Sequence, residues 1–442
     1  MASEQTGTTT PAPTRGPART ATGTTKTASG SGTSAPRAWT LRILVVGIVL
    51  TALNLRPAIT SLGALLEEVR DGLGMSGGVA GLLTSVPPLC FGVFGIMAPR
   101  LARRFGPGAV VCAGMAAITA GLLLRPYVGG TAGFLVGSAL ALMGIAVSNV
   151  LMPVIVKRWF PDRVGSMTGL YSMALALGTA SAAAVTVPLT DALGGSWRIG
   201  LAVWAALSAV AVLPWIPFVR PAGTAPADGA APAAGSGRGE PDEGLRIVRS
   251  RTAWALAVFF GLQATAAYIT MGWMAQIFRD AGVAAGTAGV LLAVTMVMGV
   301  PLAFVIPRLA SRLPHQGPIV IALGVCGLAG YAGLYWAPAG GAWAWAVLLG
   351  VSNCAFPLAL TMVGMRARTS AGVAKLSAFA QSTGYLLSIP GPLLVGVLYQ
   401  SSGGWGLPLA LMAGLMVPQI VVGVLAGRNG TVEDETAGAP GR

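Results

Sequence analysis

The sequence predicts an all-α polytopic membrane protein, with twelve transmembrane helices arranged in two pseudo-symmetric six-helix halves. Three observations support this fold class. The chain of 442 residues is 54% hydrophobic and only 10% charged, and its mean hydropathy is +0.73, far from a soluble composition. Apolar runs of about 20 residues recur along it, long enough to cross the hydrocarbon core of a bilayer as helices. The second half of the chain repeats motifs of the first.

The chain divides into five predicted segments. Residues 1–37 are rich in Thr, Ala, Pro, Ser and Gly and hold no apolar core, so we expect a disordered cytoplasmic tail. An N-terminal half over 38–220, a Pro, Ala and Gly-rich cytoplasmic linker over 221–251, a C-terminal half over 252–427 and a cytoplasmic tail over 428–442 follow. The twelve apolar runs lie at 39–66, 78–99, 108–126, 131–156, 164–189, 197–219, 252–278, 284–307, 317–337, 341–365, 373–399 and 405–427.

The placement of Lys and Arg predicts the orientation. If the N-terminus is cytoplasmic, 23 of the 28 Lys and Arg residues fall in cytoplasmic segments and four on the other side, with Arg56 inside the membrane. Both termini are therefore expected in the cytoplasm, and the protein in the plasma (inner) membrane. The same bias explains the net charge of +14 without nucleic acid as a partner. We expect a monomer in the lipid bilayer.

Motifs of the first half recur in the second at nearly one offset. Pro99-Arg100-Leu101-Ala102-Arg103-Arg104 reappears 208 residues later as Pro307-Arg308-Leu309-Ala310-Ser311-Arg312. Ser148-Asn149 with Pro153 matches Ser352-Asn353 with Pro357, 204 residues later. The chain thus contains two halves in the same orientation, and a substrate site is expected near the midplane, where the halves meet.

One arginine lies within the first apolar run, in Leu53-Asn54-Leu55-Arg56-Pro57-Ala58-Ile59-Thr60. A charged side chain at bilayer depth costs at least ~2.5 kcal/mol, so it usually faces a polar cavity or a partner. Pro57 removes a helical N–H and disfavours helical angles at Arg56. Such broken backbone is tolerated in a membrane only where protein or water covers it. This segment is therefore predicted to line an internal cavity.

The acidic residues offer Arg56 no partner. All 14 lie in tails, loops or helix ends, and the nearest, Glu67 and Glu68, are about 16 Å away along the helix. Arg56 is then satisfied either by helix carbonyls and neutral polar groups or by an anion that enters the cavity and binds its fork of donors. The only histidine, His315, belongs to a loop, which leaves facilitated diffusion, exchange and proton movement with the substrate open.

Several motifs resemble one group of the major facilitator superfamily, that of the cyanate permeases and 2-nitroimidazole exporters. They are Ala52-Leu53-Asn54-Leu55-Arg56-Pro57-Ala58-Ile59-Thr60-Ser61, Ala80-Gly81-Leu82-Leu83-Thr84 and Ala98-Pro99-Arg100-Leu101-Ala102-Arg103-Arg104-Phe105-Gly106. Phe260-Gly261-Leu262-Gln263 and Phe379-Ala380-Gln381-Ser382-Thr383-Gly384-Tyr385-Leu386 fit the same group. The resemblance covers about 40–427 and implies the major facilitator fold, alternating access and a cavity lined by the first, fourth, seventh and tenth helices. Pro99 replaces the acidic residue common in the superfamily, so a gating salt bridge built on that acid is missing.

The candidate site residues follow from depth and from this resemblance. We expect the substrate to contact Arg56, Asn54, Thr60, Asn149, Gln263, Tyr268, Asn353 and Gln381. The amides could instead be polar contacts between helices, typically worth ~0.6 kcal/mol each. Five arginines, which read first as topology determinants, are gating candidates because they could hold the cytoplasmic ends of the halves together: Arg100, Arg103, Arg104, Arg308 and Arg312.

The expected function is transport of a small polar solute, anionic or planar, such as a cyanate-like or nitroimidazole-like compound. A drug or metabolite efflux permease of the same fold and a non-transporting membrane receptor are the alternatives. An enzyme would need a cluster of His, Cys or carboxylates at membrane depth, and the sequence has none there. No cofactor and no metal are expected, and the four cysteines read as reduced packing residues.

Overall fold

The computed structural model describes residues 38–219 and 247–437. The predicted N-terminal tail at 1–37 and most of the predicted linker lie outside these ranges. Within them every regular element is a helix, and twelve segments are long and apolar enough to cross a membrane. The predicted number of transmembrane helices and their approximate positions are confirmed.

Six spans form the N-terminal half. The first and last are each built from shorter helices in series, and α3 (Leu66–Leu73) follows the first span. The spans are α1 (Ala38–Asn54) with α2 (Pro57–Ala64), α4 (Gly77–Phe105), α5 (Pro107–Leu124), α6 (Gly130–Trp159), α7 (Val164–Ala192), and α8 (Trp197–Ala202) with α9 (Trp204–Val212) and η2 (Leu213–Phe218).

The C-terminal half repeats this arrangement, and a short helix, α19 (Val432–Ala437), follows its last span. Three of its six spans consist of two helices. The spans are α10 (Arg251–Asp280), α11 (Ala285–Val297) with α12 (Gly299–Arg312), α13 (Gly317–Trp336), α14 (Ala342–Asn353) with α15 (Ala355–Met365), α16 (Ser370–Ser388) with α17 (Pro390–Ser402), and α18 (Gly406–Ala426).

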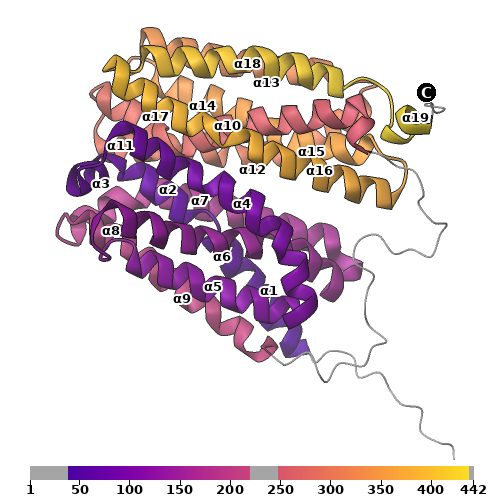
Figure 1. Cartoon of the computed structure of the whole chain (residues 1–442), viewed down its shortest axis with the longest axis horizontal. Coiled ribbons are helices and arrows are strands. Elements are labelled where there is room, and N and C mark those ends of the chain that lie inside the picture. The colour runs from indigo at the N-terminus through magenta and orange to yellow at the C-terminus, as the bar shows by residue number, and fades with distance from the viewer. Residues whose placement is uncertain (1–37, 220–246, 438–442) are drawn as a thin grey trace, which may run out of the picture.

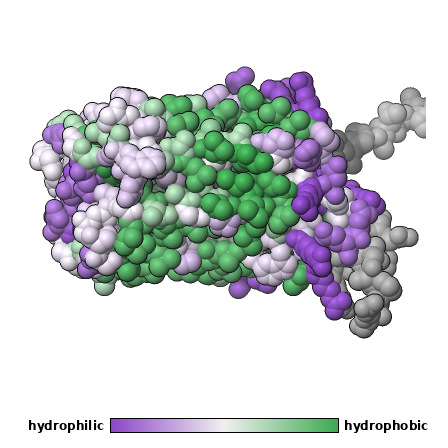
Figure 2. All heavy atoms as spheres, turned by 90° about the horizontal axis from the view of Figure 1, so that it is seen from above, coloured by the Kyte–Doolittle hydropathy of each residue, from purple (hydrophilic) through white to green (hydrophobic). Residues whose placement is uncertain are grey.

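The two halves lie side by side with their helices running along the long axis of the molecule (Figure 1). One end carries α3 and the end of α10 at Arg279, and we call it the sealed end. The opposite end carries α19 and the arginines at 100–104 and 308–312, and we call it the basic end. Figure 2 shows an apolar band between two hydrophilic ends, the surface pattern of a protein that spans a bilayer.

The halves approach each other most closely toward the sealed end. A Cβ atom on Gly63 of α2 would lie 2.0 Å from the carbonyl oxygen of Met271 on α10, so only glycine allows this contact. Toward the basic end the packing is looser, because a Cβ atom on Gly169 of α7 would lie 4.0 Å from the ring of Phe304 on α12. The backbones of the two halves are therefore in direct contact near the sealed end, at Gly63, but not toward the basic end, at Gly169.

Candidate functional site

Arg56 lies at a break in the first transmembrane span. Helix α1 ends at Asn54 and α2 begins at Pro57, with Arg56 as the residue that caps α2. The carbonyl oxygen of Arg56 accepts hydrogen bonds from the backbone N–H groups of Ile59 and Thr60. Proline suits this first helical position, where its missing N–H has no intrahelical partner to lose. The break directs the arginine side chain into the space between the halves.

Aromatic side chains from both halves surround Arg56. Its guanidinium carbon lies 5.9 Å from the ring centre of Phe91 on α4, within range of a cation–π interaction. Arg56 is also close enough to the hydroxyls of Tyr268 on α10, Tyr171 and Tyr385 to interact electrostatically with all three. The arginine therefore sits among hydroxyl groups and ring faces.

The rings around Arg56 form a connected cluster across the interface. Phe91 stacks on Tyr385 with ring centres 5.3 Å apart, and Tyr385 in turn meets Phe260 edge to face at 5.2 Å. Phe91 belongs to the N-terminal half and the other two to the C-terminal half. Flat apolar walls of this kind fit a planar solute.

Arg56 has no ion-pair partner among the residues that the structure describes. Ion pairs there include those of Arg279 with Glu67 and Glu68, and of Arg368 with Asp434. Glu67 and Glu68 are therefore engaged elsewhere, in agreement with their expected distance along the helix. The side chain of Arg56 is half-buried, so a cation remains accessible near the middle of the protein.

Two of the predicted amides lie in matching places in the two halves. The Oδ1 atom of Asn149 on α6 accepts a hydrogen bond from the hydroxyl of Tyr171, and both side chains are half-buried. In the other half, Gln263 donates from Nε2 to the backbone oxygen of Asn353 at 2.9 Å and to its Oδ1 at 2.8 Å. The Oε1 atom of Gln263 accepts from Gln419 at 3.2 Å.

The remaining candidates form local contacts. Asn54 donates to the carbonyl of Leu50 at 2.7 Å and to that of Leu207 on α9 at 3.3 Å, so its amide joins two helices of one half. The hydroxyl of Thr60 donates to the Arg56 carbonyl at 3.2 Å and is fully buried. Gln381 donates to Ser377 one turn earlier and is half-buried. Of these three, only Gln381 is partly accessible.

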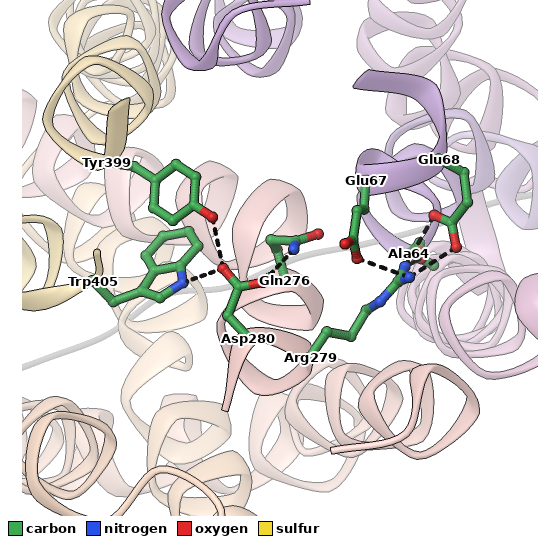
Figure 3. A network of polar contacts seen from close by, with 8 residues as sticks. All are labelled: Ala64, Glu67, Glu68, Gln276, Arg279, Asp280, Tyr399 and Trp405. Carbon is green, nitrogen blue, oxygen red and sulfur yellow. Dashed lines mark hydrogen bonds and ion pairs between the residues drawn. The ribbon is translucent and has the colours of Figure 1, made fainter. Parts of the chain in front are cut away.

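The sealed end holds a polar network that the sequence did not reveal (Figure 3). Arg279 of the C-terminal half forms ion pairs of 2.9 Å with Glu67 and with Glu68 of the N-terminal half. Asp280, its neighbour, accepts hydrogen bonds from Tyr399 at 2.8 Å and from Trp405 at 2.7 Å. Ionic contacts thus cross the interface here, and the carboxylates that form them come from a helix, α3, beyond the end of the first span.

The five predicted gating arginines lie at the basic end, where they are exposed. None of them forms an ion pair within the described ranges. Only Arg104 has a recorded aromatic contact, with its own neighbour Phe105. In this conformation these arginines do not connect the halves.

Sequence reasoning named Tyr268 but missed the other members of the aromatic cluster, Phe91, Phe260 and Tyr385, because phenylalanine and tyrosine in an apolar run read as ordinary core or interface residues. It also missed the partner of Glu67 and Glu68. The repeated Arg70-Asp71 and Arg279-Asp280 pairs were a usable signal, since they place charged residues at the same end of both halves.

The sequence profile of the Major Facilitator Superfamily matches residues 44–384. The chain belongs to this superfamily. Its fold agrees, since the crystal structure of the nucleoside transporter NupG superposes with a TM-score of 0.69 at 13% identity, covering 88% of this chain and 99% of that one.

Relatives within the superfamily are similar over most of their length. The chain is 34% identical to the uncharacterized transporter YycB of Bacillus subtilis (strain 168), with 87% of this chain and 94% of the relative covered. It is 32% identical to the 2-nitroimidazole transporter of Escherichia coli (strain K12), with 88% and 96% covered. Identity to the cyanate transport protein CynX of the same organism is 29%, with 85% and 95% covered. This superfamily member is an integral membrane transporter and not an enzyme.

Proposed function

We propose that the protein carries a small planar anion across the membrane by alternating access, and that Arg56 binds this anion. The observation that supports the proposal is the accessible guanidinium of Arg56, which has no acidic partner among the described residues. A guanidinium held in this way lacks a counter-ion. An anionic substrate can supply one. Its planar fork of donors matches flat anions and carboxylates.

The walls of the site favour a flat solute. Phe91 and Tyr385 present stacked rings, and Tyr268 adds a hydroxyl beside the arginine. A cyanate-like anion uses the donors, and a nitroimidazole-like ring also uses the aromatic faces. The names of two relatives, the 2-nitroimidazole transporter and the cyanate transport protein, support both members of this substrate class.

Other partly accessible polar side chains are proposed as additional contacts to the substrate. Asn149 and Asn353 offer half-buried amides from equivalent places in the two halves, and Gln381 offers another from α16. Gln263, whose amide is engaged by Asn353 and Gln419, holds Asn353 in place. Asn54 and Thr60 are buried and position the segment that carries Arg56: Asn54 joins α1 to α9, and Thr60 binds the Arg56 carbonyl.

We assign the basic end to the cytoplasm, because Lys and Arg gather in cytoplasmic segments of membrane proteins. Both termini are then cytoplasmic, in the plasma membrane. The sealed end faces outward, and Arg56 is reached from the inside. The five arginines of the basic end have no ion-pair partner across the interface in this conformation of the described chain, and we assign them a role in the opposite one, when the cytoplasmic ends approach.

Counterflow in proteoliposomes tests this proposal, with labelled cyanate as the anion and labelled 2-nitroimidazole as the ring. Replacing Arg56 by Gln should reduce cyanate counterflow at least ~30-fold, because loss of a charged binding partner costs ~2 kcal/mol or more. Arg56→Lys keeps the charge but loses the fork of donors. Its rate of cyanate counterflow should therefore lie between the rates of the unchanged protein and of Arg56→Gln. Counterflow at the wild-type rate by a monodisperse Arg56→Gln protein contradicts the proposal.

The matched control is Arg42→Gln. Arg42 is an exposed arginine at the beginning of the same transmembrane span, so its loss changes the net charge equally without touching the cavity. Its counterflow should match that of the unchanged protein. Absence of any counterflow in the unchanged protein with either solute would contradict the proposed substrate class and favour a drug or metabolite as the substrate.

A further inference from the structure

A second arginine is buried near the sealed end. Arg125 follows α5 and is only 2% exposed. Its Nη1 atom donates to the carbonyl oxygen of Ala58 on α2 at 3.0 Å, and its guanidinium carbon lies 5.8 Å from the ring centre of Phe134. The Nε and Nη2 atoms are buried and have no hydrogen-bond partner among the described residues.

A purely structural role explains this side chain poorly. Burying a charged group is costly unless ion pairs and hydrogen bonds compensate for lost hydration. Arg125 has one hydrogen bond, one ring face and no ion pair within 38–219 and 247–437. Two adjacent donors of a buried guanidinium that lack partners point to a ligand, as buried polar groups are nearly always satisfied. The donors favour an anion that accepts both bonds.

A serine hydroxyl one residue along the chain from the Gly137 contact with Arg125 is also without a partner among the described residues. Ser138 on α6 is 1% exposed, and its Oγ atom has no hydrogen-bond partner in the described part of the chain. Its neighbour Gly137 packs directly on Arg125, since a Cβ atom on Gly137 would lie 2.8 Å from the Arg125 Cα atom. Two unsatisfied groups of different type therefore occur in neighbouring places, one after α5 and one on α6.

Ser138 lines a small pocket between the halves, and Arg125 lies behind its wall, bound to the carbonyl of the lining residue Ala58. The pocket is lined by Ala58, whose carbonyl binds Arg125, by Ser138, and by Tyr268 and Gly272 of the C-terminal half. The hydroxyl of Tyr268 also lies near Arg56. The pocket thus lies between the surroundings of Arg56 and the sealed end, and its wall is shared by both halves.

We propose that Arg125 and Ser138 form a second anion-binding site, on the sealed-end side of Arg56, which takes a small monovalent anion when the halves part there. The fork of Nε and Nη2 and the serine hydroxyl supply three donors. The site rests on the proposed function, in that it serves the same class of anion, and it forms an outer station on the path to Arg56. In the conformation described here, Tyr268 and Gly272 of the C-terminal half close the pocket that Ser138 lines.

Anion binding to purified full-length protein tests this site without transport. Thermal unfolding is followed with rising sodium thiocyanate, with sodium gluconate keeping the ionic strength constant. The Arg56→Gln protein removes the central site, and an additional Arg279→Ala substitution weakens the sealed end. Thiocyanate should raise the unfolding temperature saturably in both proteins, because a ligand of the folded state stabilises it. The half-saturating concentration should be several-fold lower with Arg279→Ala, since more molecules then expose the site.

Serine variants test whether thiocyanate binds at Ser138. In the Arg56→Gln background, Ser138→Ala should raise the half-saturating concentration about fivefold. Ser148→Ala is the matched control: Ser148 lies on the same helix, is equally buried and also lacks a hydroxyl partner among the described residues, but it packs near Gly114. It should leave binding unchanged. Arg125→Lys tests the fork and should weaken binding while retaining the charge.

Two results overturn this inference. One is the absence of a saturable thiocyanate effect in both Arg56→Gln proteins, and the other is an equal effect of Ser138→Ala and Ser148→Ala. Neither result touches the proposed function, which fails only if Arg56→Gln leaves cyanate counterflow unchanged. The two proposals can therefore fail separately.

Discussion

The sealed end and the basic end use charged residues in opposite ways. At the sealed end, carboxylates of the N-terminal half pair with Arg279 of the C-terminal half. At the basic end, the carboxylates of α19 serve their own half. Glu435 accepts hydrogen bonds from Ser250 and Thr252 at the beginning of α10, and Asp434 pairs with Arg368.

This difference shows which contacts hold the present conformation. Charges that cross the interface oppose separation of the halves, whereas charges that bind within one half stabilise that half and leave the interface free. Arg366 follows the second pattern, because it is buried and donates to the carbonyls of Ala426 and Gly427 in its own half. In alternating access, ionic contacts between the halves must break at one end of the transporter and form at the other.

The largest expected effect comes from the glycine contact near the sealed end. Gly63→Ala places a methyl group against the Met271 carbonyl, and such overpacking costs ~1–3 kcal/mol. The halves should part there, and a cysteine introduced at buried Leu83 should react at least about fivefold faster with a membrane-impermeant maleimide, in a protein whose native cysteines are replaced.

Gly169→Ala is the control for this change, because Gly169 faces the other half across a gap that accommodates a methyl group. Its maleimide rate should equal that of the parent. Equal acceleration by both alanine variants would show that the two ends are not packed differently.

Arg279→Ala should have a smaller effect of the same kind. Both ion pairs are partly exposed, so their loss costs ~1 kcal/mol and shifts the ratio of conformations several-fold. The maleimide rate at Leu83→Cys reports this shift. Exchanging the charges, as Arg279→Glu with Glu68→Arg, should recover part of the parent rate, and no recovery would mean that Arg279 acts by packing alone.

Substituting arginines at the basic end should affect only the conformational cycle. Arg100 and Arg308 are exposed and have no ion-pair partner in the described ranges. Arg100→Gln with Arg308→Gln should therefore lower turnover about threefold, by an amount typical of exposed charges, with an unchanged KM for cyanate. A changed KM with unchanged turnover would contradict a gating role.

The smallest expected effect is at α19. Partial burial alone would raise the pKa of Glu435, but hydrogen bonds from Ser250 and Thr252 outweigh it and lower the pKa below its usual range. A lowered carboxyl pKa stabilises the folded state above the unfolded pKa, and this contribution is lost as pH falls through the folded pKa. Glu435→Gln should lower the unfolding temperature by about 1–2 °C at neutral pH.

This difference between Glu435→Gln and the parent should vanish in acid. Asp162→Asn serves as the control, because Asp162 is an exposed carboxylate elsewhere in the protein. A difference between Glu435→Gln and the parent that persists unchanged at acid pH would show that the carboxylate charge is not what docks α19.

The sequence by itself determined the spans and the place of the charge. Hydropathy depends on contact with lipid, whose thickness sets the length of each helix, so twelve spans can be read without tertiary information. Pro57 and Arg56 are neighbours in the chain, and the break in the first span is a local consequence of proline geometry.

Only the tertiary structure decided which side chains meet. Arg125 counts among the outer-loop arginines in the sequence, yet it is buried against α2. Glu68 and Arg279 are 211 residues apart, and their contact depends on how the two halves pack against each other. Residues that pair across such a distance leave no periodic signal, because their positions are set by the packing of helices and by the conformation of the transport cycle.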